Sequence, residues 1–340
     1  MHGAQIPILA PAPGEAVELV DGVLWARMPL PFALNHVNVY LLADTGGWAV
    51  VDTGLGGEAT RKIWLQLLSG PLKGAKLTRI IATHHHPDHI GLAGWLAGVF
   101  EAPVLATEAE FLFAENLRQN ERILDEEIFR RFYRRHRMED QFVAAVVKQG
   151  RYYKHMVSEL PWPYHQVSAG ERLTIGGRRF EVMTGGGHSS DQILLYCAED
   201  ALFLPADQVL PGISPNISVH AYSPEADPLG QYLRSLAAIK AAVPEDVLIL
   251  PGHNAPFSGL HERIDQLVEH HGARCAIIAE ACRREPRTAS EMLPLLFPRA
   301  LDIHQTSFAF GETLAHMNAM ARLGQLNWSW DNGAQLALSA

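Results

Sequence analysis

The sequence predicts a mixed α/β fold of the α+β kind. Short apolar runs alternate with helix-like segments through the first third of the chain, a pattern typical of this class. A long strand-free stretch follows, after which strand-like runs resume. With 340 residues the chain exceeds one average domain, which indicates a large domain with a smaller one inserted or appended.

The first of these segments form a predicted hairpin, a helix and a buried strand. Apolar runs at 37–43 and 48–52 flank a Gly-containing turn and predict the hairpin. Apolar periodicity predicts a helix over 58–68. The run 77–83 then predicts a buried strand that leads directly into the sequence HHHPDH.

The remaining segments suggest an insertion and a tail. Amphipathic helices without strand patterns predict a helical insertion at about 107–165, within a catalytic domain over 1–260. Residues 261–340 read as helices to about 284, after Thr288 and over 306–323, followed by a hairpin around Asp331-Asn332-Gly333. This order suggests a winged-helix-like module. Further strands are predicted at 172–175, 179–184, 192–197, 201–205 and 247–250, and a helix at 228–242.

The composition of the chain favours some substrate classes and one cellular compartment over others. A net charge of −9 disfavours nucleic acid as a partner and favours a small-molecule substrate. The three cysteines form no CxxC pair, and no secretory signal pattern or membrane-length apolar run is found, so we expect a cytoplasmic protein without a membrane anchor. The tail is expected to serve packing or homodimerisation, because its apolar residues have core spacing.

The chain is unusually rich in histidine, with 17 residues of this type. His84 and His86 are two residues apart, so an extended segment presents both on one side toward one cation. Pro87 favours a helix start, which turns Asp88 and His89 toward a second position. A lone ligand-type side chain is more often structural, but burying four of them within six residues without a metal would be costly. Three further candidates follow predicted strands: His188, Asp207 and His253.

In this order, the motifs HHHPDH, GGGHSS, LPADQ and LPGHN resemble the metal-binding motifs of the metallo-β-lactamase superfamily over about residues 20–260. The resemblance implies an αββα sandwich and two zinc ions, although iron or manganese also suits such ligands. It also implies that Asp207 bridges the metals and that Asp52 orients a ligand histidine. The implied ligands of the first metal are His84, His86 and His188, and those of the second are Asp88, His89 and His253.

The resemblance implies hydrolysis by a hydroxide shared between the two metals, with Asp88 aligning it. His220 and Tyr222 are further catalytic candidates, as donors to an oxyanion. Because the second-metal site has Asp88 and the terminal His253 of PGHN rather than a Cys, the chain resembles glyoxalase II more than B1-type β-lactamases. Its tail resembles that of the lactamase-beta-like endoribonuclease group. We therefore expect a thioester or ester substrate, such as an acyl-CoA or acyl-glutathione. Phosphodiester or RNA hydrolysis, and lactone or β-lactam-like amide hydrolysis, are the alternatives.

An arginine-rich run at 130–137 has two interpretations. Such runs are usually solvated helix faces, and neighbouring carboxylates can neutralise this one. If the insertion covers the metal site, the guanidinium groups would instead hold an anionic end of the substrate, such as a CoA phosphate.

Overall fold

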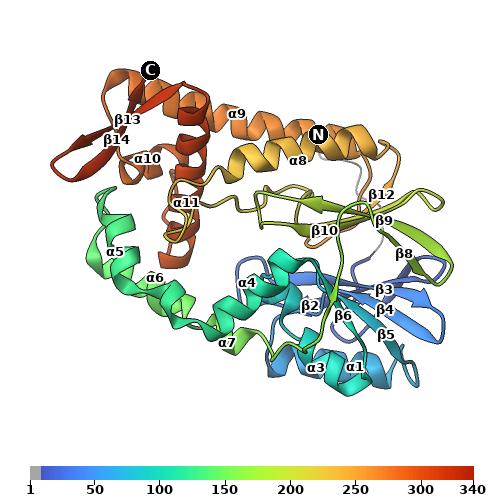
Figure 1. Ribbon diagram of the computed structural model, residues 1–340. Coiled ribbons are helices and arrows are strands. Elements are labelled where there is room, and N and C mark those ends of the chain that lie inside the picture. Colours follow the sequence, from blue (N-terminus) through green and yellow to red (C-terminus); the bar gives the residue numbers. More distant parts are fainter. Residues whose placement is uncertain (1–8) are drawn as a thin grey trace.

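The computed structural model describes residues 9–340 and shows two facing sheets enclosed by two helical layers (Figure 1). This arrangement is the predicted αββα sandwich. The first sheet has seven strands in sequential order, antiparallel from β1 to β4 and parallel from β4 to β7. Its strands are β1 (Val17–Val20), β2 (Val23–Pro29), β3 (His36–Asp44), β4 (Gly47–Val51), β5 (Leu77–Ile81), β6 (Val104–Ala106) and β7 (His165–Gln166).

The second sheet has five strands in the order β12-β11-β10-β9-β8. All its pairs are antiparallel except β11 with β12. Its strands are β8 (Arg172–Ile175), β9 (Arg178–Gly185), β10 (Gln192–Cys197), β11 (Leu202–Ala206) and β12 (Leu248–Pro251). The strands predicted in this half of the chain are confirmed. The β1–β2 hairpin was not predicted, although its Asp21-Gly22 turn is a typical hairpin signal.

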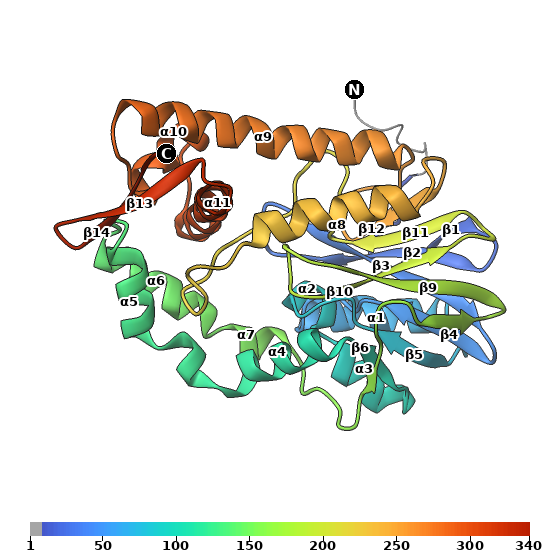
Figure 2. The same ribbon diagram turned by 45° about the horizontal axis from the view of Figure 1, so that its top comes forward.

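Side-chain alternation along the strands builds the layers. On β10, Ile193 and Leu195 pack between the two sheets, whereas Leu194 packs on the outer side with the helices. The outer helices are α1 (Glu58–Ser69) and α3 (Ala93–Phe100) on the first sheet, and α8 (Pro228–Ala242) and α9 (Leu260–Arg284) on the second (Figure 2). The loops that carry the HHHPDH, GGGHSS, LPADQ and LPGHN motifs therefore extend from two packed sheets, each covered by helices on its outer face.

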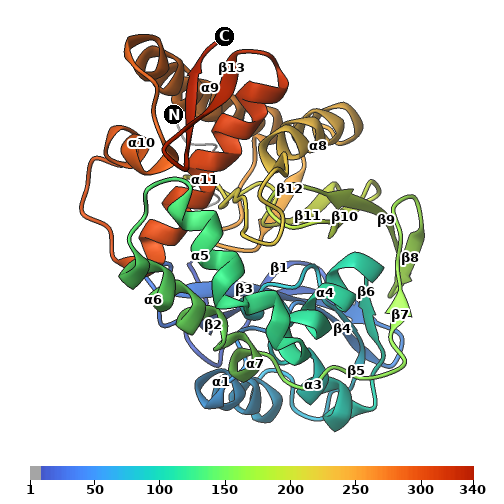
Figure 3. The ribbon, with the colours of Figure 1, turned by 60° about the vertical axis from the view of Figure 1, so that its left-hand side comes forward.

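The predicted insertion is helical and runs from β6 to β7. It consists of α4 (Glu108–Gln119), a 3-10 turn (Glu121–Leu124), α5 (Glu126–Arg134), α6 (Asp140–Gly150) and α7 (Tyr153–Met156). Its far end does not lie free, because Phe132 and Tyr133 share one apolar cluster with α11. Figure 3 shows α5 and α6 beside that helix.

The C-terminal segment has the predicted order of helices followed by a hairpin. It comprises α10 (Ala289–Leu296), α11 (Ile303–Arg322) and the hairpin of β13 (Leu326–Asp331) and β14 (Ala334–Ser339). Helix α10 starts at a capping box formed by Thr288 and Glu291. Helix α11 starts three residues before the predicted 306, because the carboxylate of Asp302 caps it. Within residues 9–340, every helix is too short or too polar to cross a bilayer.

Candidate metal centre

Loops that follow four strands place the candidate ligands at one edge of the sandwich. The loop after β5 carries His84 and His86, and the short helix α2 (Pro87–Ile90) begins at the proline, as predicted. His188 follows β9, Asp207 follows β11 and His253 follows β12. The strands end side by side, so residues distant in sequence meet here.

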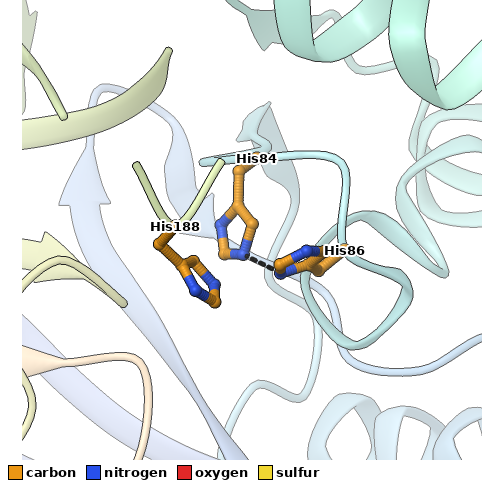
Figure 4. A group of neighbouring side chains, drawn as sticks. All are labelled: His84, His86 and His188. Carbon is orange, nitrogen blue, oxygen red and sulfur yellow. Dashed lines mark hydrogen bonds between the residues drawn. The ribbon is translucent and has the colours of Figure 1, made fainter. Parts of the chain in front are cut away.

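One group consists of three histidines from two loops. Nε2 of His84 lies 3.0 Å from Nδ1 of His86, and the ring centroids of His86 and His188 are 4.5 Å apart. Figure 4 shows the three rings turned toward one another. One nitrogen from each ring lies within 4.8 Å of the other two, so the three could hold one cation.

A second group lies beside the first and contains Asp88, His89 and His253. Oδ2 of Asp88 is 3.5 Å from Nε2 of His253 and 3.7 Å from Nε2 of His89. Asp207 lies between the groups, since its Oδ2 is 3.3 Å from Nε2 of both His188 and His253. A carboxylate in this position can contact two cations at once.

The far ring nitrogens are held by other groups, which fixes the rings. Asp52 contacts Nδ1 of His89 at 2.7 Å, which is the contact expected of it. Nδ1 of His84 lies 3.0 Å from the Thr83 hydroxyl. Backbone carbonyls complete the set: those of Asn216 and His36 lie 2.8 Å from Nδ1 of His188 and His253, respectively.

The residues present fit divalent cations. Within residues 9–340, Nε2 of His89, Nε2 of His188 and Oδ1 of Asp207 are buried without a hydrogen-bond partner. Leaving such atoms unsatisfied is costly, whereas a cation would satisfy them. Although burial opposes ionisation, the imidazoles of His253 and His89 hold the pKa of Asp207 well below its usual value, as a ligand carboxylate requires.

Close backbone approach explains the glycines of two motifs. A Cβ on Gly252 would lie 2.2 Å from Oδ1 of Asp207. Gly187 has a φ of +104°, and a Cβ there would meet Tyr232 at 2.5 Å. Gly186 differs, because its nearest neighbour would be 3.6 Å away. In the GGGH motif, Gly187 is therefore the glycine that the left-handed backbone requires.

His85 points away from the centre, consistent with its exclusion from the predicted ligands. Its Nδ1 lies 2.5 Å from Oε2 of Glu110, the same carboxylate oxygen that accepts its backbone N–H. The other oxygen of Glu110 accepts the N–H of Asp191, and the hydroxyl of Tyr153 donates to the His85 carbonyl. Sequence reasoning missed this network, since no local pattern links helix α4 to the ligand loop.

His220 and Tyr222, the two candidate donors to an oxyanion, contact each other. Their rings stack at 5.1 Å, and Tyr222 also lies 5.5 Å from Phe113. Burial of the imidazole, and then the nearby His85 and His188, lower the pKa of His220 to about 4, although the residue as a whole is exposed. Their catalytic role stays a prediction.

The arginine run is partly neutralised, as one interpretation expected. Arg130 pairs with Glu127 at 2.9 Å and also with Glu126, while Arg134 pairs with Asp140. The helix carrying them packs against the C-terminal segment rather than over the metal ligands.

A third cluster contains His270, His271 and Glu312, between α9 and α11. Arg274 already pairs with Glu312, and Nδ1 of His271 lies 3.1 Å from Nε2 of His316. His271, His316 and Glu312 are buried, so this is a packed polar cluster.

This fold and this cluster of ligand-type side chains define a metal-dependent hydrolase. The chain belongs to the metallo-beta-lactamase superfamily, whose family model matches residues 33–253. Residues 275–335 match the family described as metallo-beta-lactamase-like, C-terminal domain.

Three similar proteins extend the comparison. A beta-lactamase domain protein from Burkholderia ambifaria is 37% identical, with a TM-score of 0.91, covering 100% of this chain and 98% of that one. The probable metallo-hydrolase YqjP of Bacillus subtilis (strain 168) is 25% identical over 92% of this chain and 96% of its own. Acyl-coenzyme A thioesterase MBLAC2 of Bos taurus is 26% identical over 76% and 87%, respectively.

Proposed function

We propose that this chain hydrolyses a thioester or ester of a small acyl compound with the help of two zinc ions. His84, His86 and His188 would hold one ion, and Asp88, His89 and His253 the other, with Asp207 between them. The observation that carries this assignment is the meeting of ligand-type side chains from four loops, three of which contribute a buried atom without a hydrogen-bond partner. Paired divalent cations supply an activated water and polarise the attacked carbonyl.

The protein side chains would then position the reactants. Asp88 is the most accessible acid of the centre, with 19% of its side chain exposed, so its free oxygen can accept a hydrogen bond from the attacking water. The hydroxyl of Tyr222 keeps its proton near neutral pH, because the pKa of an ordinary tyrosine is about 10. It can donate a hydrogen bond to the oxygen that becomes negative.

Two observations support a thioester or ester as the substrate class. One of the relatives is named an acyl-coenzyme A thioesterase. The net charge of −9 opposes a polyanionic RNA substrate.

Metal content and histidine substitution test the centre. Protein purified without chelator should contain about two zinc ions per chain. His86→Ala should lower kcat by at least about a hundredfold, whereas His155→Ala, which changes an exposed histidine outside the centre, should not. A metal-free active protein, or a fully active His86→Ala, would refute the assignment.

A substrate panel tests the reaction. Acyl-CoA and acyl-glutathione thioesters should be hydrolysed faster than a lactone, nitrocefin, bis-p-nitrophenyl phosphate or single-stranded RNA. Preferential RNA or phosphodiester cleavage would contradict the thioester proposal while leaving the metal centre intact. Tyr222→Phe should lower kcat about tenfold or more with little change in KM if its hydroxyl serves the oxyanion.

A further inference from the structure

A groove of about 570 Å³ opens where the insertion meets the C-terminal hairpin. Figure 2 shows α5 directly beside β13 and β14 at this place. Three segments of the chain form its wall: α5 with the residue after it, the loop at 221–224, and the hairpin. The lining residues that matter here are Arg131, Arg134, Arg135, Ala221, Pro224 and Trp330.

The groove is positively charged. Three arginines line it, and among its described lining residues none is acidic. Arg131 is nearly free, since its nearest paired carboxylate, Glu127, is 3.8 Å away and both side chains are exposed. Arg134 pairs with Asp140 through Nε and Nη2, so its Nη1 takes no part in that pair. Guanidinium groups presented this way suit phosphate oxygens.

An exposed indole lies beside these charges. Trp330 is 63% exposed, and Ile128, which also lines the groove, is 40% exposed. A flat aromatic face next to guanidinium groups is the combination that holds a nucleobase and its phosphates, because the base stacks while the phosphates pair. The adjacent carboxylate of Asp331 lies 3.5 Å from Arg137, which partly neutralises it.

The groove and the metal centre share one loop. Ala221 and Pro224 line the groove, while the neighbouring Tyr222 contacts Phe113 at 5.5 Å between ring centroids. Phe113 in turn lies 4.7 Å from His85, the neighbour of the proposed ligands His84 and His86, whose own ring is turned away from the centre. This chain of neighbouring residues runs from the groove to the loop that carries the proposed ligands.

We infer that this groove binds the phosphorylated nucleoside end of a coenzyme A thioester, whose acyl end reaches the metal centre. The inference rests on the proposed thioesterase function for the acyl end. Binding of the nucleotide end is inferred only from the residues that line the groove.

Kinetics on two substrates test the assignment. Arg131→Ala should raise KM for an acyl-CoA by about tenfold, the loss of a charge-assisted contact, with kcat nearly unchanged. KM for the corresponding N-acetylcysteamine thioester, which lacks the nucleotide, should not change. Arg130→Ala is the matched control, because that arginine lies on the same helix, pairs with Glu126 and Glu127, and is not among the groove-lining residues. Equal KM changes for both substrates, or none for either, would overturn the inference.

Direct binding separates the groove from the reaction. Adenosine 3′,5′-bisphosphate should quench tryptophan fluorescence in the wild type but less in Trp330→Phe, and Arg131→Ala should weaken its binding about tenfold. Binding without any thioesterase activity would preserve the groove assignment and refute the proposed function. Thioesterase activity without adenosine 3′,5′-bisphosphate binding would support the proposed function and refute the groove assignment.

Discussion

Oδ2 of Asp52 lies 2.7 Å from Nδ1 of His89, and its Oδ1 accepts the backbone N–H of Thr83 at 2.8 Å. One carboxylate therefore ties the end of β4 to the ligand loop after β5 and to helix α2. Asp52 has a φ of +62°, in the left-handed region that few non-glycine residues adopt. The backbone is thus held in an unusual conformation at the point where it orients a proposed ligand.

Asp52→Asn should weaken zinc binding by about 10- to 100-fold. The amide keeps the size of the carboxylate but can satisfy only one of its two partners, His89 or Thr83, as an acceptor. Competition against a chromophoric chelator measures the affinity. Asp44→Asn is a suitable control, because Asp44 is also rich in hydrogen bonds but contacts Thr78 and Arg79 rather than the ligand loop. Equal affinities of Asp52→Asn and wild type would contradict an orienting role.

Gly252→Ala should remove most of the bound metal, because the new methyl group would lie 2.2 Å from Oδ1 of Asp207 and 3.0 Å from His89. One of those side chains must move, and both are proposed ligands. Gly186→Ala, in the loop of His188, meets only ordinary contacts and should keep its metal. Elemental analysis of both purified variants decides the matter. A fully loaded Gly252→Ala protein would show that the loop yields without disturbing the centre.

Local sequence was sufficient to propose the candidate ligands because each ligand motif directly follows a strand. The apolar run before His84 and the proline after His86 determine where that loop starts and where α2 begins. The contacts that support the ligand loops could not be predicted from local sequence. Glu110 and the Asn216 carbonyl reach the centre only through tertiary packing, and the carbonyl of Arg135 accepts the N–H of Gln335 from the C-terminal hairpin. The groove at that junction therefore has no local signature.

Glu110→Gln should destabilise the fold near neutral pH by up to about 3 kcal/mol. Burial opposes the ionisation of Glu110, but His85 and the backbone N–H groups of Asp191 and His85 hold its pKa at about 2, against 4.5 for an ordinary glutamate. A carboxylate with a lowered pKa stabilises the folded state fully above pH 4.5, and the stabilisation disappears as pH falls toward 2.

The difference in unfolding free energy between wild type and Glu110→Gln should accordingly shrink below pH 4.5. Urea unfolding across this range checks it, with both proteins treated with chelator so that acid-induced metal loss does not contribute. The exposed Glu127→Gln serves as the control and should show little difference at any pH. A constant difference between the two proteins from pH 7 to 3 would mean that the charge of Glu110 contributes nothing.

Phe310→Ala should lower stability by about 3–5 kcal/mol, because it empties the apolar cluster that joins the insertion to the C-terminal segment. Phe310 is fully buried, and its ring lies 4.8 Å from Tyr133 and 5.7 Å from Phe132, both on α5. Phe308→Ala, two residues earlier and 45% exposed, should have a much smaller effect. Because the arginine groove lies at this junction, Phe310→Ala should also weaken adenosine 3′,5′-bisphosphate binding. Hydrogen exchange should quicken in α5 and α11 together, and protection lost in α11 alone would show that the insertion is held by other contacts.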